Sequence, residues 1–148
     1  MYRCQDAKVI KRNQFGDSYV YRTIDLPWPV ADRDIVMHKA MTQDPETKMV
    51  TIKNVSAPDY VPRTQHVRIE VSESLYTLEP REDGTVVLTW TQLSDPAGAL
   101  PKMLVNTMIV TSPLSTLKSL RKMVKKSPYK NAKLTYNDQG MLTGFAEP

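Results

Sequence analysis

Hydrophobic and polar positions follow a helical spacing in one long stretch of the chain, which runs from Asp95 to Val124. Apolar residues recur there at intervals of three or four positions, at Leu100, Met103, Leu104, Met108, Leu114, Leu117, Leu120 and Val124. Pro101 suits the first turn of a helix, because the N–H that proline lacks has no partner there. The pattern predicts one long helix that begins near this proline.

Pro113 interrupts this helical pattern. A proline in a helix interior leaves the carbonyl of Ile109 without its usual hydrogen bond and costs about 3 kcal/mol. We therefore expect either a kink or a new helical start, with Ser112 as the N-cap residue.

The predicted helix carries apolar residues on two sides. One arc consists of Leu100, Met103, Leu104 and Met108, and a second, more mixed arc consists of Val105, Ile109, Ser112, Thr116 and Leu120. A helix that is apolar on two sides is buried on two sides. Either the helix lies wholly within a protein core, or one arc packs on a sheet and the other faces a different partner.

The chain ahead of this helix is rich in β-formers and alternates apolar with polar positions. This pattern predicts strands at 18–25, 33–42, 48–55, 67–72 and 85–93, with 75–79 continuing or pairing with the fourth. Prolines mark a turn at 26–30 and a loop at 56–65, and Gly84 supplies the positive φ of a hairpin turn. Short connections between consecutive strands indicate an antiparallel meander, so sheet and helix together predict an α+β fold.

The two ends of the chain have weaker patterns. Residues 1–13 fit a short amphipathic helix with Cys4, Ala7, Val9 and Ile10 on its apolar side. Residues after Pro128 are mostly polar, which predicts a loop or a loosely attached extension.

Composition is that of an ordinary globular domain. The 148 residues are 41% hydrophobic and 24% charged, which suits a single domain with one core. No apolar run approaches the length of a membrane span, and charged residues between Asp6 and Arg12 interrupt any signal-peptide pattern. We therefore expect a cytoplasmic location, unless an export signal precedes Met1 in a longer gene product. The single cysteine, Cys4, excludes an internal disulfide and disfavours a cysteine-based zinc site.

The net charge of +4 is concentrated near the end of the predicted helix. The cluster consists of Lys118, Arg121, Lys122, Lys125, Lys126, Lys130 and Lys133. Such a cluster can bind anionic lipid or nucleic acid, although a solvated face that complements the helix C-terminus is the commoner case. We expect a transient contact with an anionic membrane surface through Lys118, Lys122, Lys125 and Lys126, and no nucleic-acid partner.

Motifs that carry a known catalytic or metal-binding chemistry are missing from the sequence. It holds no glycine-rich phosphate loop, no Gly-x-Ser-x-Gly and no His-Glu-x-x-His. Neither His38 nor His66 has a Cys, Asp or Glu at the spacing of metal ligands. We therefore expect no cofactor, no metal and no catalytic residue, and His38 fits a half-buried strand position better than a catalytic base.

Two positive charges within the predicted strands require partners. Arg33, between Asp32 and Asp34, fits a structural role in which it ties the turn to a neighbouring strand through charge-assisted hydrogen bonds. Lys39 shares a strand face with apolar residues. If a helix covers that face, the buried ammonium requires an acid, water or the polar end of a ligand. If the strand lies at a sheet edge, Lys39 reaches solvent instead.

Several short motifs follow one another in a specific order along the chain. They are Pro27-Trp28-Pro29, Asp32-Arg33-Asp34, Val67-Arg68, Pro80, Asp95-Pro96-x-Gly98-x-Leu100-Pro101-Lys102 with Asn106, and Leu120-Arg121. In combination they resemble the START lipid-transfer domain, and its bacterial members most closely, over residues 2–124. The resemblance implies a START-like domain at 1–127, followed by a tail at 128–148.

The resemblance also implies a helix-grip (START/Bet v 1-like) fold. In that fold a curved antiparallel sheet wraps around a long C-terminal helix and encloses an apolar tunnel, which holds a lipid or another apolar molecule non-covalently. The ligand-binding residues that it implies here are Ile35, Met37, Lys39, Ile52, Asn54, Trp90, Val105, Ile109, Ser112, Thr116 and Leu120. Sterol-binding relatives place an arginine at the position of Lys39 and an acid on the preceding strand, which offers no acid here before Asp25.

Three functions follow from these expectations. The first is non-catalytic binding or transfer of a lipid or other apolar small molecule. The second is an enzyme on the same scaffold, of the polyketide cyclase or aromatase type, that would use Lys39, His38, Asn54 or a tyrosine. The third is a truncated domain that acts only as an oligomer, because the helix and strands that open the START domain are missing ahead of Met1. An incomplete sheet favours homo-oligomers or strand exchange.

Overall fold

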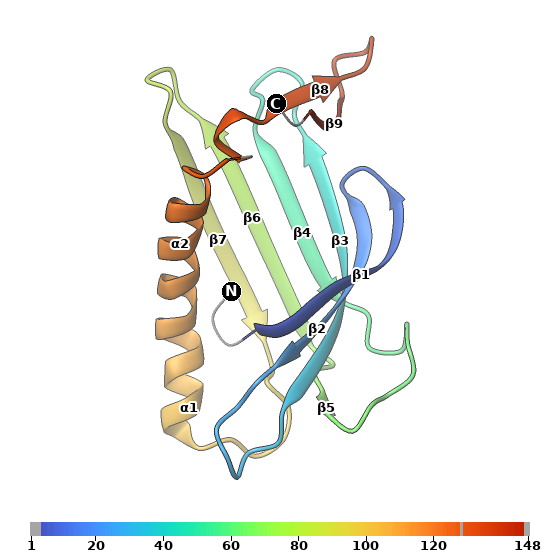
Figure 1. The fold of residues 1–148 in the computed structure, drawn as a ribbon, viewed down its shortest axis with the longest axis vertical. Helices are drawn as coiled ribbons and strands as arrows, with labels where there is room; N and C mark the ends of the chain where they lie inside the picture. The colour runs from blue at the N-terminus through green and yellow to red at the C-terminus, as the bar shows by residue number, and fades with distance from the viewer. Residues whose placement is uncertain (1–3, 128, 147–148) are drawn as a thin grey trace.

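A single curved antiparallel sheet and one C-terminal helical region form most of the molecule, as predicted. The computed structural model describes residues 4–127 and 129–146. The long strands are β1 (Cys4–Gln14), β2 (Asp17–Ile24), β3 (Arg33–Gln43), β4 (Val50–Ser56), β6 (Ser72–Pro80) and β7 (Val86–Ser94). They pair in the order β1-β2-β3-β4-β6-β7, which confirms the meander. The sheet curls, so that β1 and β2 cross in front of the strands that follow them (Figure 1).

The N-terminal segment is a strand, and the predicted amphipathic helix at 1–13 is wrong; residues 1–3 of that prediction lie outside the described residues. β1 pairs antiparallel with β2, and Ala7 lies opposite Arg22. Gly16, with φ of +79°, closes the turn between the two strands. The apolar residues of this segment fit either structure locally, so pairing with a distant strand decides between them.

The predicted strand at 67–72 is replaced by two separate elements. β5 (Val67–Arg68) is a two-residue strand that pairs parallel with the start of β3. The N–H of Ile69 then donates to the carbonyl of Asp34, and β6 begins at Ser72. The prediction missed the parallel pairing because the loop between β4 and β5 carries the chain back to the beginning of β3.

The C-terminal helical region consists of α1 (Lys102–Asn106), a π-helical turn η1 (Thr107–Thr111) and α2 (Ser112–Met123). The N–H of Ser112 donates to the carbonyl of Thr107, five residues back. This widened turn accommodates Pro113, which has no N–H to give to Ile109. A new α-helical segment therefore starts beside the proline, which is one of the two expected outcomes, but Thr111 is its N-cap residue and Ser112 its first residue.

The start of this region also differs slightly from the prediction, since Pro101 is the N-cap residue of α1 and lies outside the first helical turn. Among the described residues, no helix combines the length and the hydropathy needed to cross a membrane.

The tail is not the predicted loop. It forms a 3-10 turn η2 (Tyr129–Asn131) and a hairpin of β8 (Lys133–Tyr136) and β9 (Leu142–Ala146). The ring of Phe145 in β9 makes an edge-on contact with Phe15, at 6.3 Å between ring centres. This aromatic contact attaches the hairpin to the turn between β1 and β2.

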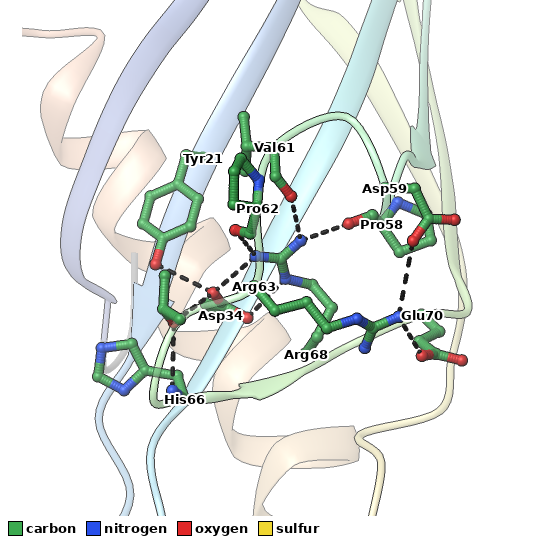
Figure 2. A network of polar contacts seen from close by, with 11 residues as sticks. Tyr21, Asp34, Pro58, Asp59, Val61, Pro62, Arg63, His66, Arg68 and Glu70 are labelled. Carbon is green, nitrogen blue, oxygen red and sulfur yellow. Dashed lines mark hydrogen bonds and ion pairs between the residues drawn. The ribbon is translucent and has the colours of Figure 1, made fainter.

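A buried ion pair fixes the loop between β4 and β5 against the sheet (Figure 2). Arg68 donates from Nε to Asp34 Oδ1 at 2.7 Å and from Nη2 to Oδ2 at 3.0 Å. Thr64 and Tyr21 donate to the same carboxylate. Arg68 also donates to loop carbonyls, including that of Pro62 at 3.2 Å.

Candidate ligand-binding cavity

A cavity of about 710 Å³ separates the sheet from the helical region. Its sheet side is lined by Cys4, Arg22, Ile24, Leu26, Pro27, Ile35, Met37, Asn54, Ile69, Ser72, Ser74, Tyr76, Trp90, Gln92, Leu93, Ser94 and Pro96. Its helical side is lined by Met103, Leu104, Val105, Thr107, Ile109, Ser112, Pro113 and Thr116. The size and the mainly apolar lining with a few polar groups are typical of small-molecule sites.

Eight of the eleven predicted ligand-binding residues lie in this lining. They are Ile35, Met37, Asn54, Trp90, Val105, Ile109, Ser112 and Thr116. The other three are not lining residues. They are Lys39, Ile52 and Leu120. Leu120 is one helical turn beyond Thr116, where the helical lining ends. Ile52 pairs with Tyr76, which lines the cavity although Ile52 does not. Whether any of these residues contacts a ligand remains a prediction.

Both predicted arcs of the helix contribute to the lining. Met103 and Leu104 belong to the first arc, and they line the cavity together with Val105 and Ile109 of the second; the side chain of Met108 lies outside the described residues. The cavity therefore separates the helical region from the sheet. The expected burial of the helix on two sides is wrong, because no residue of α1 or α2 is buried and Met103 and Ile109 are 74% and 67% exposed.

Sequence reasoning missed most of the polar lining residues. Register places Ser74 directly across from Asn54, and Asn54 Nδ2 donates to Ser74 Oγ at 2.9 Å. On the next row, the rings of Tyr76 and Trp90 stack with centres 5.1 Å apart. The alternation along β6 would have placed Ser72, Ser74 and Tyr76 on one face, had the boundaries of this strand been known.

Two buried polar atoms at the cavity wall have no hydrogen-bond partner within the described part of the chain. They are the indole Nε1 of Trp90 and the hydroxyl Oγ1 of Thr116. A buried polar group without a partner costs free energy, and native structures hold few of them. Both residues line the cavity, but these two polar atoms are themselves covered by the surrounding protein.

Arg22 is the charged residue in the cavity lining of the described chain. Burial lowers the pKa of its guanidinium, while Cys4 and Tyr76 act in the opposite direction. Burial also lowers the pKa of Lys39, and the positive charges of Arg22 and Arg12 lower it further. Positive charge is therefore gathered where β1, β2 and β3 adjoin.

Lys39 belongs to an interior strand and not to a sheet edge, so the solvent-reaching alternative for an edge lysine does not apply. Its side chain is half-buried and its neighbour across β2 is Ser18. The acid that sterol-binding relatives carry on the preceding strand is therefore not opposite Lys39, and Asp25 lies beyond the end of β2.

Arg33 ties β3 to the segment before the helix. It donates from Nε to the carbonyl of Pro96 at 3.3 Å and from Nη2 to that of Ala97 at 2.9 Å. The expected structural role is confirmed, although the partner is a loop and not a neighbouring strand. This contact anchors the segment that leads from β7 into α1.

His38 lies on the opposite face of the sheet from the cavity. Its Nε2 is 2.8 Å from Asp17 Oδ1, and its ring stacks on Tyr19. The side chain is half-buried, as expected for a residue that fills a strand position.

Comparisons with known proteins agree with this geometry. A START domain model matches residues 2–130. An uncharacterised protein of Pseudomonas aeruginosa is 31% identical over 128 residues, which cover 85% of this chain and 62% of that relative. The chain thus spans less than two thirds of the length of the curated relative.

Two solved structures share the fold. A STAR-related lipid transfer protein from Xanthomonas axonopodis has a TM-score of 0.74 and 30% identity, covering 85% of this chain and 70% of the other. Human STARD10 has a TM-score of 0.63 and 27% identity, covering 84% of this chain and 49% of the other. With its helix-grip architecture and the family match over most of its length, this chain belongs to the START domain family.

Proposed function

We propose that this chain binds, and transfers, a lipid or other apolar small molecule held non-covalently between the sheet and the helical region. The observation that carries the proposal is the cavity of about 710 Å³. Its volume is within the range of pockets that enclose small molecules. The likeness to lipid-transfer proteins supports a lipid-binding domain.

A binding role fits the lining better than a catalytic one. Of the groups that an enzyme on this scaffold would use, His38 lies on the far face of the sheet and Lys39 is outside the lining. Asn54 does line the cavity, but it is engaged with Ser74. Tyr76 lies against Trp90, and burial raises the pKa of its phenol, which makes it a poorer proton donor near neutral pH.

The proposal is tested by filling the cavity from the helix. Thr116→Trp places a large ring into the lining, whereas Ser119→Trp adds the same ring at an exposed position of the same helix. Binding of the neutral apolar dye Nile red is measured by fluorescence. We expect Thr116→Trp to weaken binding about tenfold or more, equivalent to about 1.4 kcal/mol, and Ser119→Trp to bind as the native chain does. Equal binding by both variants, or no binding by the native chain, would overturn the proposal.

We further propose that α2 contacts anionic membranes during transfer. Lys118 and Lys122 are exposed on it, with Lys125 and Lys126 just beyond its end. Large apolar side chains on the same helix are exposed as well, among them Leu114 and Leu117. A surface that combines lysines with exposed apolar groups suits an anionic bilayer.

Membrane contact is measured by co-sedimentation with vesicles. Binding to vesicles of phosphatidylcholine and phosphatidylserine is expected to weaken in Lys122→Glu/Lys125→Glu and in high salt. Lys53→Glu, on the exposed outer side of β4, is the matched control. Equal sedimentation of all three proteins would contradict the contact.

A further inference from the structure

The two edges of the main sheet differ in how well they are protected against pairing with a further strand. Its edge strands are β1 and β7 (Figure 1). β1 carries charged side chains at Asp6, Lys8, Lys11 and Arg12, and its register with β2 shifts at three places. Charges and irregular register are features by which natural edge strands avoid unwanted pairing. The β1 edge is therefore closed to a further strand.

The edge strand β7 has none of these protective features. Its sequence, VVLTWTQLS, contains no charged residue and no proline, and its register with β6 is continuous from Val86 to Ser94. The large apolar side chains of Val86, Val87 and Leu93 are 56%, 41% and 67% exposed. Within residues 4–127 and 129–146, no strand pairs with its second side. A long, uncharged edge of this kind is a template for another strand.

The backbone groups that β7 offers at this edge follow from its pairing with β6. The N–H of Arg81 donates to the carbonyl of Thr85, and the N–H of Asp95 donates to the carbonyl of Val71. In an antiparallel pair the backbone groups of alternate residues point toward the partner and the others point away from it. The residues of β7 whose N–H and C=O groups face the open edge are therefore Val86, Leu88, Trp90, Gln92 and Ser94.

We propose that the β7 edge is the docking surface for a second copy of this chain, with the two β7 strands paired antiparallel about a two-fold axis at Trp90. Such a contact is isologous, because each copy presents the same residues to the other. Self-association, which the sequence led us to expect, then occurs at this one edge. It requires no bound ligand, so the dimer is independent of the function proposed above.

The strand is complementary to its own copy in this register. Trp90 lies opposite the same residue of the second copy, and Leu88 lies opposite Gln92. The backbone groups of these residues all face the open edge, so the hydrogen-bond ladder continues from one copy into the next. The axis at the middle of β7 lets the whole strand pair.

Side chains on neighbouring rows agree with the same register. Val87 lies opposite Leu93, and Thr89 lies opposite Thr91. Apolar pairs and threonine pairs stabilise antiparallel strands, whereas like charges directly opposite one another destabilise them. An uncharged strand brings no like charges together, and the exposed Val87 and Leu93 cover each other.

The assembly stops at two copies. Pairing uses the β7 edge of both chains and leaves only the protected β1 edges at the ends of the combined sheet. One strand from each copy makes an interface at the small end of the size range for specific complexes. We therefore expect a reversible dimer with a dissociation constant on the order of 10 μM.

Sedimentation velocity of the native chain, from about 1 to 200 μM, measures this equilibrium across the expected dissociation constant. We expect the monomer to be replaced by a dimer as the concentration rises, with no larger species. A native chain that stays monomeric throughout would overturn the dimer, while the proposed ligand binding would stand if that monomer binds Nile red. Growth beyond two copies would overturn the isologous pairing.

Charge substitutions at Thr89 and Thr91 test the strand and its register, because both side chains are exposed. Thr89→Lys/Thr91→Lys sets like charges opposite one another in the proposed dimer, and so does Thr89→Glu/Thr91→Glu. We expect each to weaken dimerisation about tenfold or more. Thr89→Ser/Thr91→Ser, a neutral change at the same positions, should dimerise as the native chain does.

A mixture of the two charged variants decides the proposal most sharply. Opposite charges then face each other across the axis, so we expect a mixed dimer to form where neither variant dimerises alone. Far-UV circular dichroism of each variant verifies that it folds. A dimer that survives in the lysine variant, or a mixture that stays monomeric when both variants fold, would overturn the pairing of β7 with itself.

Discussion

Arg68 and Asp34 form a bidentate ion pair that is almost entirely buried, with 1% and 0% of their side chains exposed. Burying two charges is costly, and the loss of one partner leaves the other uncompensated. We expect Asp34→Asn to lower the free energy of unfolding by about 3–5 kcal/mol, since it leaves the guanidinium of Arg68 without a counter-charge. Urea denaturation followed by far-UV circular dichroism measures the loss.

The control for this substitution is an exposed pair in the same sheet. Lys53 Nζ and Glu73 Oε1 are 2.9 Å apart, but both side chains are about half exposed. Glu73→Gln should cost less than about 1 kcal/mol, because exposed pairs are screened by water. Similar losses from Asp34→Asn and Glu73→Gln would show that burial does not distinguish the two pairs.

Acid should weaken the fold through the same carboxylate. Burial alone would raise the pKa of Asp34, but hydrogen bonds from Arg68, Thr64 and Tyr21 and the charge of Arg68 bring it below its ordinary value. A group with a lowered folded-state pKa stabilises the fold above its unfolded pKa, and this contribution is lost as the pH falls through the folded pKa.

Thermal unfolding between pH 7 and pH 2 measures this dependence. We expect the melting temperature to fall below about pH 4, the region where an unfolded aspartate titrates. Tyr21→Phe removes one donor to the carboxylate and so raises its folded-state pKa toward the unfolded value; the fall should therefore be smaller and end at a higher pH than in the native chain. A melting temperature that is constant down to pH 2 would exclude a linked carboxylate.

Two glycines with the same backbone angle should differ in their tolerance of a side chain. Gly16 and Gly84 both have φ of +79°. A Cβ at Gly16 would lie 3.0 Å from Met41 Cβ and 3.3 Å from its carbonyl oxygen, whereas nothing lies within 4 Å of a Cβ at Gly84. We expect Gly84→Ala to cost about 1–2 kcal/mol of backbone strain, and Gly16→Ala to cost more.

Urea denaturation of the two glycine variants isolates the steric contribution, because the conformational cost is common to both. A Gly84→Ala variant that is less stable than Gly16→Ala would contradict the crowding that Met41 imposes on the β1–β2 turn.

The fluorescence emission of Trp90 should change when a ligand occupies the cavity. The chain has two tryptophans; Trp28 is 92% exposed and Trp90 lines the cavity. In a Trp28→Phe background, an apolar ligand should change the emission of Trp90. The Trp90→Phe protein, which keeps Trp28, should show no such change. A response from Trp28 alone would place the ligand outside the cavity.

The spacing of apolar residues along the chain correctly predicted which residues share a face of a strand or of the helix. Alternation placed Ile35 and Met37 on one face of a strand, and helical spacing put Val105, Ile109 and Thr116 on one arc; all five line the cavity. Gly84 adopts the positive φ expected of it. These features depend on periods of two and of 3.6 residues, which the sequence displays directly.

Features that depend on distant partners were missed. β1 was expected to be a helix, and β5 was expected as part of a longer strand without its parallel partner β3; no local signal specifies the partners of either strand. The boundary of the cavity also depends on tertiary structure, so the sequence could not show that Ile52 and Leu120 lie outside the lining. Arg22 was missed because a charged strand residue ordinarily indicates a solvent-facing position.

Native mass spectrometry of the chain, after incubation with a total lipid extract and removal of unbound lipid, tests the central claim most directly. We predict the 16.9 kDa chain with a discrete additional mass that disappears on extraction with organic solvent and is reduced in Thr116→Trp. Only the mass of the chain itself, as a monomer or as an oligomer, would contradict the claim that the cavity between sheet and helix holds a ligand.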